Sequence, residues 1–136
     1  MAAGFHLKVV TPSGAAYDKP VMSVTATTEA GEITVLPEHC LLLSALEAGR
    51  LVAVGLDGTR EQFVLNTGFL EAGPDHVNII SENCLAAGDI DPEKLAKEAE
   101  EIRKKLDDEP DGSPIAATLK AQLAWVDACL VVFGDQ

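Results

Sequence analysis

The residues best suited to chemistry gather in one short stretch, positions 30–43, where polar side chains interrupt an apolar run. His39 and Cys40 are neighbours there, and such a pair could provide an activated thiol or two metal ligands. Adjacent residues on a strand point to opposite faces, so the two side chains cannot easily share a proton or a metal ion. His6 and His76 lie far off in the sequence with no ligand spacing. We predict no metal site and no thiol chemistry.

Glu32 and His39 are the more informative polar pair in this stretch. They flank a predicted strand–turn–strand corner, because Pro37 cannot donate to a sheet ladder and should end the first strand. Two interpretations follow from the residues alone. The pair contacts a polar partner surface, or both are solvent-exposed edge residues. Spacing by itself favours the second interpretation.

No other pattern indicates catalysis. The chain has neither the Gly-x-x-x-x-Gly-Lys loop that cradles phosphates nor the Gly-x-Ser-x-Gly turn that presents a nucleophilic serine. Its carboxylates are scattered or fall on a predicted wet helix face, so no general acid–base pair can be chosen. We predict no catalytic residues and no cofactor. An enzyme that uses the corner of Glu32 and His39 remains an alternative, with a perturbed His39 titration as its signature.

Composition limits the classes of partner. The chain has 136 residues, a net charge of −12 and 47% hydrophobic residues, enough for one ordinary domain with a real core. The acidity argues against nucleic acid and against insertion into anionic lipid. No apolar run approaches the roughly 18 residues that span a bilayer, and the N-terminus lacks the pattern of a signal peptide. Three cysteines without paired spacing indicate reduced thiols.

The elements that must position these residues are mostly strands. Through about residue 88, short β-branched or alternating segments recur between turn clusters, which predicts an antiparallel β-sandwich or flattened barrel of about ten short strands. Asp57-Gly58 predicts a hairpin with a two-residue turn. The cluster at 17–20, ending in Pro20, predicts a break between strands.

After residue 88 the sequence pattern changes from strand-like to helix-like. Asp91 and Pro92 start a predicted helix with an apolar stripe, and Ser113 and Pro114 start a second. We expect the stripes to contain Leu95, Ala99, Ile102 and Leu106 in the first helix, and Ile115, Leu119, Leu123, Val126 and Leu130 in the second. The chain thus divides into a sandwich domain, 1–88, and a C-terminal antiparallel two-helix hairpin, 89–136. Whether the hairpin is a permanent cap or a marginally docked switch stays open.

Several motifs occur in an order that resembles one family, the epsilon subunit of bacterial F-type ATP synthase (delta in mitochondria). The family typically has Gly-Glu-x-Gly-[hydrophobic]-x-Pro-Gly-His-x-Pro-Leu-Leu at its central turn. The matching segments here are Leu7-Lys8-Val9-Val10-Thr11-Pro12, Gly31-Glu32, Val35-Leu36-Pro37-x-His39-x-Leu41-Leu42, Ala48-Gly49, Gly68-Phe69-Leu70-Glu71 and Val77-Asn78-Ile79-Ile80.

The resemblance implies a ten-stranded sandwich with two C-terminal helices, and a non-catalytic rotor subunit of the central stalk. It implies that the sandwich binds the gamma subunit and the polar loops of the membrane c-ring, at the cytoplasmic face of the bacterial inner membrane as a peripheral subunit. It further implies contact between the hairpin and the alpha and beta catalytic subunits. By position Glu32 and His39 face the c-ring, which reverses the preference from spacing, and Glu38 adds a charge to that corner.

The departures from the family pattern carry expectations of their own. Some members bind ATP through Ile/Leu-Asp-x-x-Arg-Ala at the first helix, where this chain has Ile90, Asp91 and Lys94, followed by Leu95. Lysine lacks the bidentate geometry of arginine, so we predict no useful ATP binding. Lys120 is the one cation from Asp111 to the end, so we expect at most weak inhibition of ATP hydrolysis. The competing hypothesis is a free-standing ligand-binding β-sandwich with a helical lid.

Overall fold

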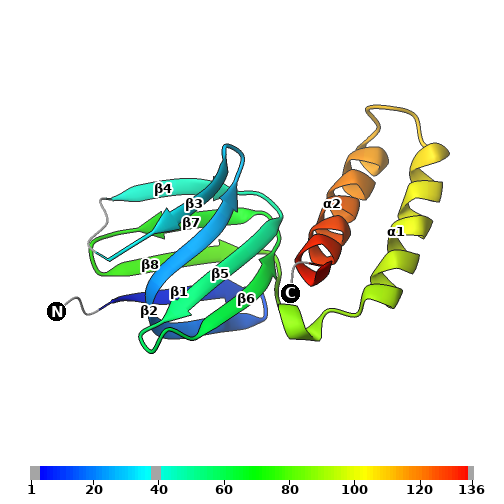
Figure 1. Cartoon of the computed structure of the whole chain (residues 1–136). Coiled ribbons are helices and arrows are strands. Elements are labelled where there is room, and N and C mark those ends of the chain that lie inside the picture. The colour runs from blue at the N-terminus through cyan, green and yellow to red at the C-terminus, as the bar shows by residue number, and fades with distance from the viewer. Residues whose placement is uncertain (1–3, 38–40, 135–136) are drawn as a thin grey trace.

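The strands form a single sheet that folds back on itself into two packed layers (Figure 1). The computed structural model describes residues 4–37 and 41–134. Its strands are β1 (Phe5–Thr11), β2 (Gly14–Thr28), β3 (Gly31–Val35), β4 (Leu42–Leu46), β5 (Gly49–Gly55), β6 (Arg60–Leu65), β7 (Gly68–Ala72), β8 (His76–Ser81) and β9 (Cys84–Ala86). A short 3₁₀ turn, η1 (Ala87–Asp89), leads to the helices α1 (Pro92–Asp107) and α2 (Pro114–Gly134).

Strand β2 joins the two layers because it is long enough to take part in both. Its first half pairs with β1, and its second half pairs with β5 on one side and β3 on the other. The strand order β1-β8-β7-β4-β2-β5-β6-β9 therefore returns to β2 through β1. The nine strands confirm the predicted sandwich or flattened barrel. Their pairing departs from the prediction in one place, since β1 and β8 run parallel.

Alternating side chains fill the space between the layers. In β1, Phe5, Leu7 and Val9 point inward, while His6 and Lys8 point outward. The opposite layer contributes residues such as Leu51 and Phe63, and the ring of Phe63 meets that of Tyr17 edge-on at 5.5 Å between centroids. Burying side chains of this size contributes about 1.5–3 kcal/mol each, so this core carries most of the sandwich's stability.

Two local predictions about the strands are wrong. Pro20 does not break the chain, because it lies inside β2 opposite His6. That half of β2 has a partner strand on one side only, so proline costs no bond on the other side. The β5–β6 connection is also longer than two residues: the Gly58 N–H donates to the Gly55 carbonyl at 3.0 Å, and Gly58 has φ +85°. A turn closed by a left-handed glycine makes a three-residue loop.

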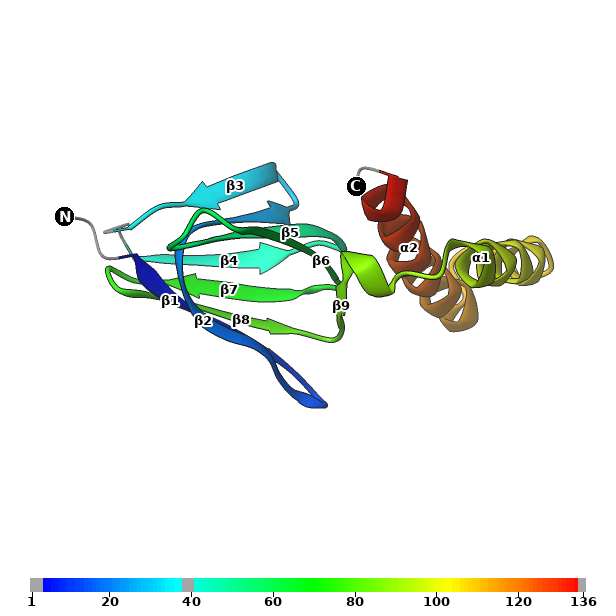
Figure 2. The same cartoon turned by 60° about the horizontal axis from the view of Figure 1, so that its bottom comes forward.

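The helices form the predicted antiparallel hairpin, which lies against one end of the sandwich (Figure 2). Both predicted caps are confirmed, since the Asp91 carboxylate accepts from the Lys94 N–H and the Ser113 hydroxyl accepts from the Ala116 N–H. Arg103 of α1 pairs with Asp127 of α2 at 3.2 Å.

Helix α2 buries most of the predicted stripe, including Leu119 and Val126, together with a neighbouring face that was not predicted. Ile115 is 58% exposed, whereas Cys129 and Val132 are buried. The difference arises because α2 packs on two neighbours at once, α1 and the sandwich. Its last turns join Val64 of β6, Ala87 and Ile90 in a second apolar cluster. The placement of the domain boundary at residue 88 remains a proposal.

Helix α2 also qualifies the prediction about apolar runs. Lys120 and Asp127 interrupt it, so no continuous run reaches the length of a membrane span. By length and average composition the helix is nevertheless apolar enough to cross a membrane, and only 28% of that segment is buried inside the molecule. A helix that docks on both a sheet and a second helix has the same composition, so this feature by itself is weak evidence for a membrane span.

Candidate functional site

Glu32 lies at the end of the sandwich that faces the helices. It follows the β2–β3 turn and pairs in register with Thr27. Its carboxylate forms an ion pair with Arg50 of β5, with 3.2 Å between Oε2 and Nη2. The last turns of α2 lie nearby, since Glu32, Arg50 and Val131 line one shallow hollow. The pair is largely exposed to solvent, so it contributes little to stability.

The end of β3 and the start of β4 lie at the opposite end of the sandwich. The register brings Thr28 of β2 opposite Leu46, the last residue of β4, so the start of β4 points the other way. Glu38 and His39, the other predicted contact residues, lie outside the described residues. The length of β3 separates Glu32 from Leu36. Glu32 therefore lies at the start of the edge strand β3, and the predicted corner with His39 stays a prediction.

The structure shows where each residue of the degenerate nucleotide motif lies. Ile90 is buried in the second apolar cluster. The Asp91 carboxylate caps α1 by accepting from the Lys94 N–H at 3.2 Å. Lys94 itself is exposed on the first turn of α1. The aspartate thus accepts a hydrogen bond from one of the backbone N–H groups that have no partner within the helix. This capping role explains the residue without a bound ligand.

The outer face of the layer β4-β7-β8-β1 carries an exposed apolar surface. The register places Ala45, Phe69, Ile80 and Val10 in one row across the four strands. Leu43 begins the next row and continues with Glu71, Asn78 and Lys8. We call these two rows the outer face. Phe69 is 59%, Ile80 64% and Leu43 73% exposed, and a hollow of about 400 Å³ lies among them.

Sequence reasoning did not identify the outer face, although a signal was present. Strands β4, β7 and β8 place large apolar residues on both faces, as in the neighbours Leu42 and Leu43 and the neighbours Ile79 and Ile80. A strand with one wet face should alternate with polar residues. Apolar residues on both faces indicate that both are covered, and none of the described residues covers the second face. Contiguous exposed apolar surface of this kind marks an interaction site.

A histidine cluster lies at the edge of the outer face. A carboxylate faces each ring nitrogen of His76, with Asp75 Oδ1 3.0 Å from Nδ1 and Glu71 Oε1 3.3 Å from Nε2. Hydrogen bonds from Asp75 and Glu71 raise the pKa of His76 above its ordinary value. His6 pairs with His76 in the β1–β8 register and also contacts Asp18. The cluster adds a charged rim to an apolar surface.

The chemistry available at these surfaces is that of binding. Burial raises the pKa of the Cys84 and Cys129 thiols to about 11, so both are protonated near neutral pH. No group of three or more metal-ligating side chains comes together within residues 4–37 and 41–134. What the described chain offers is an apolar face with a charged rim.

Comparison with known proteins places these features in context. Residues 4–87 match the family model described as the ATP synthase delta/epsilon chain, beta-sandwich domain. The ATP synthase epsilon chain of Moorella thermoacetica is 32% identical over 129 residues, covering 93% of this chain and 96% of the relative. That of Bacillus subtilis is 30% identical over 109 residues, covering 80% of this chain and 82% of the relative.

Solved structures agree in fold. A chain of the Euglena gracilis mitochondrial ATP synthase, from a cryo-EM structure of its OSCP/F1/c-ring, superposes with a TM-score of 0.81 at 25% identity. The match covers 94% of this chain and 80% of that one. A chain of the Tetrahymena thermophila central stalk and c-ring superposes with a TM-score of 0.57 at 12% identity, over 95% of this chain and 96% of that one, a likeness of fold alone.

Proposed function

The chain belongs to the family of ATP synthase delta and epsilon chains, and from this premise we propose how it works as a rotor-stalk subunit. The family membership supports a non-catalytic component of the F-type ATP synthase central stalk that takes part in ATP synthesis. We propose that it has no catalytic residues of its own and couples the gamma subunit to the c-ring. Its place is peripheral, at the cytoplasmic face of the bacterial inner membrane.

The outer face is the observation that supports docking on the gamma subunit. Phe69, Ile80 and Leu43 are large, exposed and contiguous across three paired strands. Covering each of them would contribute about 1.5–3 kcal/mol before the costs of association. Lys8, Glu71 and His76 at the edge supply the polar rim that such interfaces have.

Contact with the c-ring is a second part of the proposal, and it falls on the edge strand β3. Glu32 has its carboxylate on Arg50 at the start of the strand, and Glu38 and His39 follow its end outside the described residues. A contact that includes all three positions would run along the length of β3. The polar loops of a c-ring suit such an edge, because among the described residues β3 pairs only with β2.

The test is co-elution with the cognate gamma subunit in size exclusion. We expect a one-to-one complex. The alternative, a free-standing ligand-binding sandwich, predicts separate elution of two folded proteins. The family match and the near full-length similarity to epsilon chains do not favour that alternative.

We also propose that the hairpin inhibits ATP hydrolysis only weakly through any contact with the alpha and beta subunits. Lys120 is the only cation of α2, and Arg103 of α1 is engaged with Asp127. An extended hairpin would therefore gain little from electrostatic attraction. A chain truncated after Gly88 should change the ATPase activity of the assembled enzyme less than about twofold. A severalfold rise in activity would contradict this proposal.

A further inference from the structure

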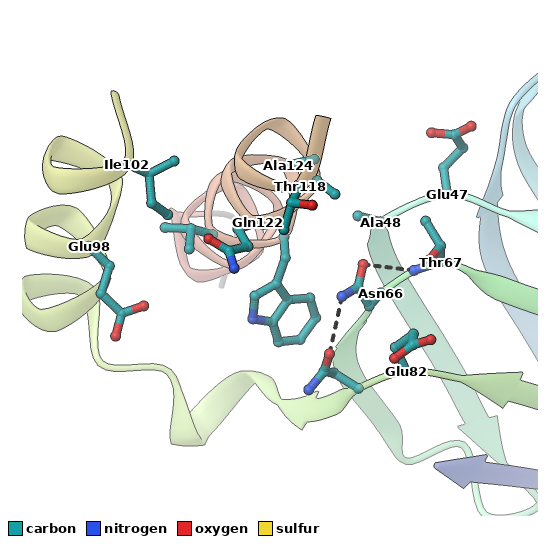
Figure 3. Close-up of a pocket in the computed structure, with 14 residues that line it drawn as sticks. Glu47, Ala48, Asn66, Thr67, Glu82, Glu98, Ile102, Thr118, Gln122 and Ala124 are labelled. Carbon is teal, nitrogen blue, oxygen red and sulfur yellow. Dashed lines mark hydrogen bonds between the residues drawn. The ribbon is translucent and has the colours of Figure 1, made fainter. Parts of the chain in front are cut away.

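A groove separates the hairpin from the end of the sandwich (Figure 3). Its volume is about 560 Å³. Figure 3 shows Glu98 and Ile102 of α1, and Thr118, Gln122 and Ala124 of α2, on one side, facing Glu47, Asn66 and Glu82 of the sandwich on the other. The outer face lies on another side of the sandwich, so this groove is distinct from the proposed gamma contact.

The floor of the groove is apolar and includes the chain's only tryptophan. Ala121, Ala124, Ile102 and Val126 contribute aliphatic surface, and Trp125 is half-buried beside them. Trp125 also borders a second hollow of about 330 Å³ that extends toward the β1–β2 turn. Glu82 and Asn83 also line both hollows, so the two adjoin at the indole, and together we call them the path.

The charges along this path all have one sign. Glu47, Glu82 and Glu98 line it, and no lysine or arginine does so among the described residues. The ion pairs of the described chain lie elsewhere, and none includes these three carboxylates. Glu98 is half-buried, and its charge reaches the interior, since it adds to burial in raising the pKa of Cys129 to about 11.

The polar groups between the carboxylates are held in place. The Asn66 side-chain amide donates to the side-chain Oδ1 of Asn83 at 3.1 Å, and its own Oδ1 accepts from the Thr67 N–H at 2.8 Å. The wall that these residues form is therefore ordered by its own hydrogen bonds. An acidic groove that contains an indole suits a flat cation, because a guanidinium both pairs with carboxylates and stacks on an aromatic face.

We propose that this groove receives an arginine-bearing segment of a neighbouring stalk subunit, with the guanidinium beside Trp125 and the carboxylate of Glu98. The proposal rests on the proposed function for the identity of the partner. Charge complementarity selects the occupant, since an anionic ligand such as a nucleotide would meet three unneutralised carboxylates. The groove would thereby add a second contact between this chain and the stalk. Because both the hairpin and the sandwich line the groove, this contact requires the docked hairpin.

The test uses the full-length chain and the peptide acetyl-Gly-Arg-Gly-amide, with acetyl-Gly-citrulline-Gly-amide as the uncharged isostere. Because Trp125 is the only tryptophan, its fluorescence reports occupancy of the groove directly. We expect a saturable change with the arginine peptide and none with the citrulline peptide. Glu98→Gln should weaken binding about threefold, the size typical of a solvent-accessible ion pair.

The matched control is Glu101→Gln, which removes the same charge from an exposed position of α1 outside the groove. It should leave the affinity unchanged. Equal losses in the two variants would mean attraction to net charge alone, and the absence of a fluorescence change would mean no site; either result overturns the proposal. If the wild-type chain fails to co-elute with gamma, the stalk assignment fails, whereas the peptide titration still decides whether the groove binds a guanidinium.

Discussion

At the scale of single residues, His76 is the side chain whose protonation matters most. Its two ring nitrogens each face a carboxylate, Asp75 and Glu71. Both nitrogens can donate only when the ring is a charged imidazolium. The geometry and the raised pKa therefore agree, and the cluster holds the β7–β8 turn through two charge-assisted hydrogen bonds.

The first prediction is that the pKa of His76 lies above the ordinary histidine value of 6.5. A raised folded-state pKa contributes stability that is fully present below the unfolded pKa and is lost as pH rises through the folded pKa. Asp75 has a lowered pKa, so its contribution is present above 3.8 and is lost on acidification. NMR titration of the ring measures the midpoint. Asp75→Asn should lower it more than Glu71→Gln, because the Asp75 hydrogen bond is the larger cause.

An unchanged midpoint in both variants would show that the carboxylates do not hold the imidazolium.

Asp91 illustrates a different point about single residues. Its position in a motif resembles a nucleotide site, but its carboxylate caps α1. The capping role was predictable from Asp91 and Pro92 alone, because both preferences are local.

At the scale of elements, strand β6 explains how the hairpin is attached. Phe63 and Leu65 point into the sandwich, and Val64 between them is fully buried beneath α2. Both faces of this strand are therefore covered, one by the opposite layer and one by the hairpin. The second cluster is small, and α2 is otherwise largely exposed, so the docked hairpin has far fewer buried contacts than the sandwich.

The second prediction is that Val132→Ala loosens the hairpin and spares the sandwich. Val132 is 1% exposed on the last turns of α2, and removing its two methyl groups should cost about 2 kcal/mol. Hydrogen exchange should show faster exchange of α2 amides, with β1, β7 and β8 unchanged. Val131→Ala is the control, because Val131 is its neighbour and is 63% exposed. Equal effects of the two substitutions would contradict the docking through this cluster.

The elements also show where prediction from sequence succeeded and where it stopped. The strands, the helix caps and the first helix's stripe follow from short-range rules, and the structure confirms them. The continuation of β2 through Pro20 depends on which neighbour strands are present, which no local rule states. The buried face of α2 depends on its packing against two elements at once, so Cys129 and Val132 replaced Ile115. The parallel β1–β8 pair is a matter of topology alone.

At the scale of the whole molecule, three surfaces have different characters. The outer face is apolar, the edge strand β3 carries a solvent-exposed ion pair, and the groove beside α1 and α2 is acidic. The family resemblance identified partners but not the first or third surface, because each is assembled from residues of several elements. Register across four strands brings Leu43, Phe69 and Ile80 together, and no linear motif contains all of them.

The proposed docking of the outer face on the gamma subunit can be tested by measuring the affinity of Phe69→Asp for cognate gamma. Phe69 is 59% exposed, so the substitution should leave the fold intact. A charge in the centre of an apolar contact should weaken binding by about 2 kcal/mol or more, roughly 30-fold. Leu56→Asp is the matched control, since Leu56 is 55% exposed at the β5–β6 turn, and it should bind like the wild type. Wild-type affinity in Phe69→Asp, or an equal loss in Leu56→Asp, would contradict the claim.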